Sequence, residues 1–132
     1  MGLLLAVAIP GHLGGEGLEL RAAARAIADG LQRTRSLAVV SGAETVFAVD
    51  VVNRSFQWPG DASPSVLPPY VRVSLRTVRG AVAGVEIGGI RFFPDGGSTG
   101  GGVLLGSGGL GGQSYSITVS WLTGRVEVSD AP

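Results

Sequence analysis

The sequence predicts an α+β domain in which one long N-terminal helix packs on antiparallel sheet made of short strands. Apolar residues recur every three or four positions from Leu18 to about Ser41, which is the period of an amphipathic helix. From Thr45 onward the period is two, as in half-buried strands, and the helical pattern does not return. Turns rich in glycine, proline and aspartate separate these short strands, which favours hairpins and antiparallel pairing.

The predicted helix carries its apolar residues on one stripe and its charges on another face. We expect the stripe to be the helix packing face: Leu20, Ala24, Ile27, Leu31 and Ala38, with Thr34 in the same pattern. Asp29 and Arg33 lie four positions apart on the polar face, a spacing that supports a helix. Gly30 lowers helix stability by about 1 kcal/mol, which tertiary packing must offset. Gly42 is well placed to end the helix.

Strands and turns are expected along the rest of the chain. They are a hairpin of 45–50 and 55–58 with a turn at Asn53-Arg54, strands at 71–76, 85–87, 90–93, 103–105 and 115–121, and a last strand at 125–128. Pro59 to Pro69 holds four of the 7 prolines and is predicted to be a loop. Residues 129–132 are predicted to be a frayed tail.

Composition limits the chemistry that this chain can perform. It has 132 residues, enough for one domain with a moderate core, and 45% of them are hydrophobic. It contains no cysteine and no lysine, so thiolate, disulfide, Schiff-base and P-loop lysine chemistry are excluded. The only histidine, His12, lies in the glycine-rich stretch 11–17, where we expect an exposed loop residue. We therefore predict no enzymatic activity, no cofactor and no metal.

The net charge of the chain limits the classes of partner that it can bind. The formal net charge is zero and charged residues make up 15% of the chain, so the general attraction to nucleic acid or anionic lipid is missing. Arg72, Arg76 and Arg79 form the one basic cluster, which we interpret as the solvated side of a strand rather than a phosphate-binding face. A nucleic-acid partner is not expected.

Three further motifs have a functional and a structural interpretation, and the structural one is favoured in each case. Gly106 to Gly111 fits G-x-G-x-x-G, but a strand rather than a helix follows it, which argues against a dinucleotide loop. Asp95 lies between Pro94 and Gly96, as in a tight turn rather than a cation loop. Trp58 and Trp121 each lie in an alternating pattern, which favours packing in the core or a hairpin over base stacking.

The N-terminal run from Gly2 to Ile9 is apolar throughout, and Pro10 ends it. Eight helical residues span about 12 Å, whereas the hydrocarbon core of a bilayer measures about 30 Å. The run also lacks the basic region and cleavage site of a secretory signal. It is therefore either a buried first element or the end of a longer transmembrane helix.

Taken in order, four stretches of the chain resemble the minor pseudopilins and minor pilins of the GspH/FimT family of type II secretion and type IV pilus systems. They are the run 2–10 with its proline, the helical segment 20–38, the segment Ile90-Arg-Phe-Phe-Pro-Asp-Gly-Gly-Ser98, and 115–119 with Thr123-Gly124-Arg125-Val126. The resemblance implies a pilin-like fold and a structural role in a short filament, the pseudopilus, that exports proteins across the outer membrane. The alternative within the family is a type IV pilus minor pilin acting in pilus assembly or DNA uptake. Members of the DNA-uptake branch carry extra basic residues at the C-terminal end, where this chain has Glu127 and Asp130.

The resemblance also implies a division of the chain. Residues 1–15 are expected to be the remnant of a membrane and filament helix, and 16–132 a periplasmic globular domain. The family's processing site and most of its membrane helix do not occur here, so Met1 is expected to be an engineered or misassigned start. The implied partners are other minor pseudopilins, the major pseudopilin and the inner membrane. The candidate filament interface is Leu3, Leu4, Leu5, Val7 and Ile9.

Overall fold

The computed structural model describes the backbone of residues 4–76, 87–107 and 113–131, and the side chains of 18–76, 88–107 and 113–130. Within this described backbone, one helix precedes eight strands. In chain order they are α1 (Leu4–Ser41), β1 (Thr45–Asp50), β2 (Ser55–Gln57), β3 (Ser65–Val66), β4 (Val71–Arg76), β5 (Ile87–Phe92), β6 (Gly101–Ser107), β7 (Ser114–Val119) and β8 (Val126–Ala131).

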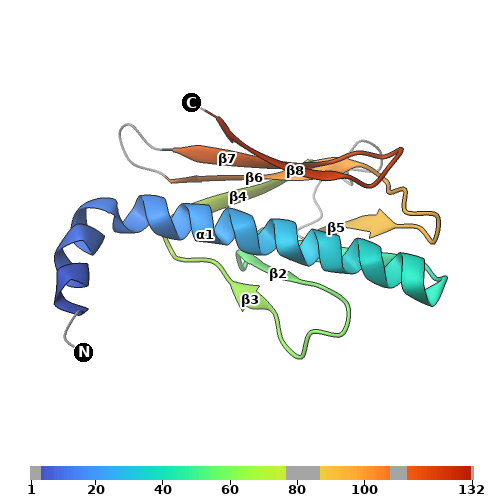
Figure 1. Cartoon of the computed structure of the whole chain (residues 1–132), viewed down its shortest axis with the longest axis horizontal. Coiled ribbons are helices and arrows are strands. Elements are labelled where there is room, and N and C mark those ends of the chain that lie inside the picture. The colour runs from blue at the N-terminus through green and yellow to red at the C-terminus, as the bar shows by residue number, and fades with distance from the viewer. Residues whose placement is uncertain (1–3, 77–86, 108–112, 132) are drawn as a thin grey trace.

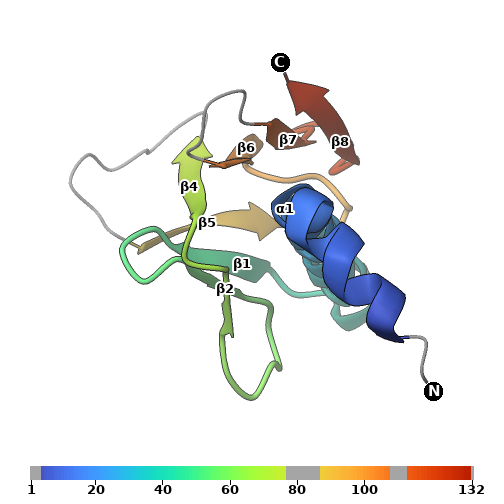
Figure 2. The same ribbon diagram turned by 90° about the vertical axis from the view of Figure 1, so that its left-hand side faces the viewer.

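The strands form two antiparallel sheets that both pack on α1 (Figures 1 and 2). Sheet A has the order β3-β2-β1-β5, and sheet B has the order β4-β6-β7-β8. Seen along the helix in Figure 2, sheet B covers α1 from above and sheet A approaches it from the other side. The predicted α+β class, with one long helix packed on antiparallel sheets of short strands, is confirmed.

The helix is longer than the sequence pattern indicates. It begins at Leu4 and runs to Ser41 without a break at Pro10, so the loop expected around His12 is wrong. A proline removes one backbone hydrogen bond and tends to bend a helix rather than end it when the neighbouring turns hold. The first turns of α1 bend away from the axis of the rest (Figure 1). Gly42 ends α1 as predicted, with a φ of 70° and its amide donating to the carbonyl of Ala38 at 3.0 Å.

In sheet A, the central strand β1 pairs with β2 on one side and with β5 on the other. The sequence predicted two short strands separated by Gly88-Gly89, but β5 is continuous because both glycines take part in the ladder, opposite Val49 and Ala48. Residues 85–86 lie outside the described residues. The predicted loop 59–69 contains the short strand β3, which pairs with β2.

In sheet B, the strands are longer or shifted relative to their predicted positions. Strand β6 covers 101–107 instead of 103–105, and β7 ends at Val119, so Trp121 lies in the following turn. The predicted frayed tail is wrong for residues 129–131, because they extend β8 and pair with 114–116 of β7. Cross-strand hydrogen bonds hold these residues although their side chains are polar or small.

The core lies between α1 and the two sheets. Its largest fully buried side chains are Phe47, Phe92, Leu20, Ile27, Leu31, Ile90, Leu105 and Ile117. Helix, sheet A and sheet B each contribute to this set, so none of the three layers can bury its apolar face without the others.

Candidate assembly surface

The stripe predicted as the packing face of α1 is buried in the domain. Leu20, Ile27, Leu31 and Ala38 have exposed fractions of 0%, and Ala24 has 1%. Thr34 is also fully buried, and its hydroxyl donates to the carbonyl of Gly30 at 2.7 Å. From Leu20 onward, one face of α1 is therefore fully used by the fold of its own domain.

At Gly30, α1 comes close to the side chains of Phe47 in β1 and Trp58 after β2. A Cβ atom at this position would lie 2.6 Å from Cε1 of Phe47 and 3.0 Å from Cε3 of Trp58. The absence of a side chain lets both aromatic rings pack directly against the helix. This close packing compensates for the low helix propensity of Gly30.

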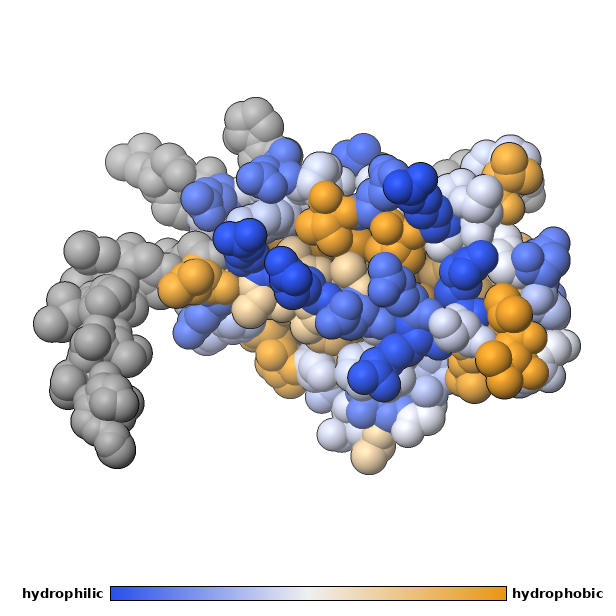
Figure 3. Space-filling view, viewed as in Figure 1, coloured by the Kyte–Doolittle hydropathy of each residue, from blue (hydrophilic) through white to orange (hydrophobic). Residues whose placement is uncertain are grey.

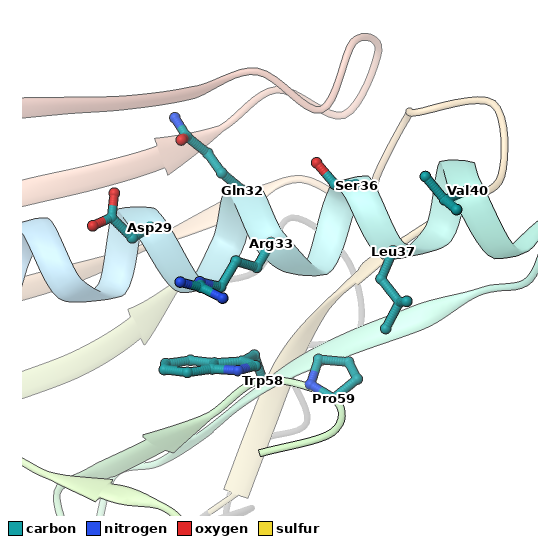
Figure 4. A pocket seen from close by; sticks show the side chains of 8 residues that line it. All are labelled: Asp29, Gln32, Arg33, Ser36, Leu37, Val40, Trp58 and Pro59. Carbon is teal, nitrogen blue, oxygen red and sulfur yellow. The ribbon is translucent and has the colours of Figure 1, made fainter.

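Trp58 forms one wall of a groove beside the exposed face of α1 (Figure 4). The ring is half-buried, and the guanidinium carbon of Arg33 lies 5.6 Å from its centroid, within cation–π range. The groove has a volume of about 670 Å³ and is lined by Asp29, Gln32, Arg33, Ser36, Leu37, Val40, Trp58 and Pro59. Leu37 and Val40 are 40% and 84% exposed. Figure 3 shows apolar side chains gathered near the end of the molecule where α1 ends.

Arg35 ties the helix to the two C-terminal turns. Its Nε donates to the carbonyl of Gly96 at 3.0 Å and to that of Thr123 at 3.1 Å. Gly124 lies against this contact, since a Cβ atom there would be 1.9 Å from the Gly96 oxygen and 2.7 Å from Arg35 Nε. The turns 93–97 and 120–124 are thus held together on the helix by one guanidinium. The sequence predicts both turns but gives no sign of the arginine that joins them.

Arg54 performs a similar task after β1; the sequence predicts that it lies in a turn but not the contacts that it makes. It occupies a left-handed conformation with a φ of 52° in the turn after β1. Its Nη1 donates to the carbonyls of Pro68, Pro69 and Val71, the first and last at 3.1 Å. This guanidinium therefore fixes the proline-rich segment before β4.

The turn that holds Arg54 is closed by Asp50. Oδ1 of Asp50 accepts from the amide of Asn53 at 3.0 Å, and Oδ2 accepts from its side-chain nitrogen at 2.8 Å. These hydrogen bonds, the backbone one first, lower the pKa of Asp50 below its ordinary value because they favour the ionised carboxylate.

The other motifs singled out in the sequence have structural positions. Oδ1 of Asp95 accepts from the amide of Gly97 at 2.8 Å, as expected for a tight turn. Gly106 pairs with Ser114 where β6 and β7 join, a strand-to-strand connection that a dinucleotide loop does not make. The packing predicted for Trp121 is wrong, because this side chain is 65% exposed.

The remaining candidates lie on exposed or undescribed parts. Arg72 and Arg76 lie on the exposed side of β4, and Arg79 lies outside the described residues. His12 belongs to α1, and the structure describes its backbone but not its side chain. Of the candidate filament interface, Leu3 lies outside the described residues, and Leu4, Leu5, Val7 and Ile9 belong to the first turns of α1.

The described residues contain neither a membrane-spanning helix nor a metal-ligating cluster. Within 4–76, 87–107 and 113–131, no helix combines the length and hydropathy needed to span a membrane. In the same part of the chain, no group of three or more histidine, cysteine or acidic residues has the arrangement of a metal site.

Comparison with known proteins places this arrangement in a family. Residues 23–124 match the family model of the type II transport protein GspH, a range that includes Arg35 and both turns that it joins. The chain is 34% identical over 125 residues to the type II secretion system protein H of Xanthomonas campestris pv. campestris, covering 95% of this chain and 70% of that protein.

Solved structures agree with the fold. The minor pseudopilin EpsH from the type 2 secretion system of Vibrio cholerae matches with a TM-score of 0.65 at 14% identity, covering 84% of this chain and 96% of that one. The type IV minor pilin FimU of Pseudomonas aeruginosa matches with a TM-score of 0.61 at 16% identity, covering 86% and 90%. The family match over residues 23–124 and the 34% identity show that this chain belongs to the GspH family of type II transport proteins.

Proposed function

We propose that this chain is a minor pseudopilin of a type II secretion system, a structural subunit near the tip of the pseudopilus that drives protein export across the outer membrane. The observation that supports this proposal is the match to the GspH family together with 34% identity to a type II secretion system protein H. The role is one of assembly with other pseudopilins, not of catalysis.

The division of the α1 surface supports this role. From Leu20 to Ala38, the apolar stripe of the helix is buried against its own domain. Before Leu18 the helix continues for several turns that reach beyond both sheets (Figure 1). An apolar helical segment with no sheet to cover it needs apolar surface from elsewhere. Neighbouring subunits of a filament would provide it through their own N-terminal helices.

We therefore propose that residues 1–15 belong to the filament and membrane end of the protein, and that 16–132 form a globular domain in the periplasm. The candidate filament interface remains Leu3, Leu4, Leu5, Val7 and Ile9. Its partners would be the major pseudopilin and other minor pseudopilins, with the inner membrane at the start of the helix.

A second candidate function is that of a type IV pilus minor pilin. The similarity to FimU, with a TM-score of 0.61, favours it at the level of the fold. The same fold serves both systems, so the sequence match to a type II secretion protein decides in favour of the first function.

Deleting the gene in its host separates the two functions. We expect exported proteins to disappear from the culture medium and to accumulate in the periplasm, while surface pili remain. Complementation with the Leu4→Asp variant should fail because a charge enters the proposed filament interface. The Val66→Asp variant should complement fully, since Val66 is 72% exposed on β3.

Loss of surface pili with intact secretion would instead assign the chain to the pilus. Full complementation by Leu4→Asp would refute the proposed filament interface. Thermal melts of the purified chain with each substitution control for stability, and both should match the unsubstituted chain.

A further inference from the structure

On the face of sheet B that points away from α1, the side chains form a regular pattern. They belong neither to the core nor to the proposed filament interface. On β4, Arg72, Ser74 and Arg76 are exposed, whereas Val71 and Val73 between them are buried. Directly paired residues of neighbouring strands lie on the same face of a sheet. The register therefore builds three rows across β4, β6 and β7: Arg72-Gly106-Ser114, Ser74-Leu104-Ser116 and Arg76-Gly102-Thr118.

Both outer rows have an arginine at one end, a glycine in the middle and a hydroxyl at the other end. The glycines leave the sheet surface low beside each guanidinium. A hollow of about 370 Å³ lies over one outer row and the middle row, with Arg76, Gly102, Leu104 and Thr118 in its lining.

Packing requires a glycine at only one of these two positions. A Cβ atom at Gly102 would lie 2.5 Å from the carbonyl oxygen of Ile117, so the close approach of β6 and β7 requires glycine there. At Gly106 the nearest atoms would be at 3.7 Å, an ordinary contact distance. The open surface at Gly106 is thus not imposed by packing.

The two arginines of this face have no partner within the described chain. Other described arginines contact a ring, a carbonyl or a carboxylate: Arg33, Arg35, Arg54, Arg91 and Arg125. Arg72 and Arg76 make no hydrogen bond or ion pair with any described residue, as is also true of Arg21 and Arg25 on α1. Their donors are available to a ligand on the outer face of sheet B.

The geometry points to an acidic β-strand of a protein partner as the ligand of this face. We propose that a segment of the pattern Glu-x-Φ-x-Glu, with Φ an apolar residue, lies over the three rows. Arg72 and Arg76 are four residues apart on β4, about 13 Å at a strand rise of about 3.3 Å per residue, which matches two glutamates four residues apart on an extended strand. Each guanidinium can hold one carboxylate through two parallel hydrogen bonds. The apolar residue between the glutamates lies on Leu104.

Protein carboxylates suit this face better than a chain of phosphates. Glu127 of β8, paired with Thr118 at the end of the Arg76 row, is already held by Arg125 at 3.3 Å. A nucleic-acid backbone would therefore meet two arginines on this face that are unpaired within the described residues, on a chain of zero formal net charge. Binding through counterion release depends on several phosphate contacts. This inference goes beyond the filament role, because it concerns a face on the side of sheet B away from α1.

Titration of the isotope-labelled chain with three synthetic peptides tests the proposal. Their cores are Glu-Thr-Val-Thr-Glu, the uncharged Gln-Thr-Val-Thr-Gln, and Thr-Glu-Val-Glu-Thr, which has the same charge at half the spacing. We expect the first to bind most tightly and to shift the amide resonances of Gly102, Leu104 and Gly106. Replacing both Arg72→Gln and Arg76→Gln should weaken this binding about fivefold, as expected for two exposed ion pairs.

The matched control is Arg21→Gln with Arg25→Gln, which removes the same charge at the same four-residue spacing and should leave the affinity unchanged. The proposal is overturned if both double variants weaken binding equally, if the glutamine peptide binds as tightly as the glutamate peptide, or if duplex DNA of equal concentration shifts the same amides more strongly. Because the titration uses the chain alone, its failure would leave the secretion phenotype of the gene deletion unaffected.

Discussion

A methyl group added at Gly124 should destabilise the domain more than the same change at any other described turn. Gly124 has a φ of 74°, which costs an alanine about 1 kcal/mol. The new Cβ would also lie 1.9 Å from the Gly96 oxygen and 2.7 Å from Arg35 Nε, so the turn or the arginine must move. That movement breaks the bifurcated hydrogen bond that the single Nε–H of Arg35 makes to Gly96 and Thr123, worth about 1 kcal/mol. The expected loss for Gly124→Ala is about 2 kcal/mol, or about 7 °C in Tm.

Equilibrium unfolding in urea measures this loss, and Gly60→Ala provides the matched control. Gly60 also has a positive φ, 87°, but nothing lies within 4 Å of the position of its Cβ. This variant should lose only the conformational part, about 1 kcal/mol. Equal losses for the two variants would mean that contact with Arg35 and the Gly96 turn contributes nothing, and the inferred role of this guanidinium would be wrong.

Three other changes separate the layers of the structure. Leu31→Asp places an unpaired charge in the core and should cost several kcal/mol in a urea melt, whereas Leu4→Asp should leave domain stability unchanged. Arg35→Lys keeps the charge but cannot reproduce the paired contact of one Nε–H to two carbonyls, so Tm should fall by about 4 °C. Because the pKa of Asp50 is lowered in the folded chain, its ionised carboxylate stabilises the fold above the pKa of the unfolded chain. This contribution disappears as the pH falls through the folded pKa, so Asp50→Asn should flatten the acid limb of a pH–stability curve.

For each of these three predictions, a specific result would contradict it. Comparable losses for Leu4→Asp and Leu31→Asp would place the N-terminal run in the core of the isolated domain. An unchanged melt for Arg35→Lys would show that the two turns hold without the paired contact. An acid limb that Asp50→Asn leaves unaltered would show that the Asn53 hydrogen bonds persist in the unfolded chain.

The sequence was sufficient to predict the fold class and the buried face of the helix. A stripe such as Leu20, Ile27 and Leu31 repeats with the period of the helix itself, so its burial follows from local geometry. Strand boundaries were less predictable, because pairing partners decide them. Gly88 and Gly89 have poor intrinsic strand propensity, yet they lie in β5 since β1 supplies the ladder.

The residues that organise the turns were not predictable from the sequence. Arg35 and Arg54 resemble any solvated arginine when each is considered with its neighbours in the chain. Their partners lie 61 and 14 residues away, at Gly96 and Pro68. A contact between a side chain and a distant carbonyl leaves no periodic signal. The glycines at 96 and 124 mark the place, because an added Cβ at either would lie 2.7 Å from a nitrogen of Arg35.

The positions of these contacts bear on how the domain would sit in an assembly. The buried stripe of α1 extends from Leu20 to Ala38, and Arg35 joins the last turns of the helix to both C-terminal turns. The globular domain is thereby fixed to the C-terminal half of α1, and the described contacts leave no free hinge between Leu20 and Ala38. A subunit held in a filament through its first helical turns would therefore present the Trp58 groove and the outer face of sheet B in one set orientation. Substitutions that loosen the Arg35 contact should disturb that orientation before they unfold the domain, because they act on the turns and leave the stripe in place.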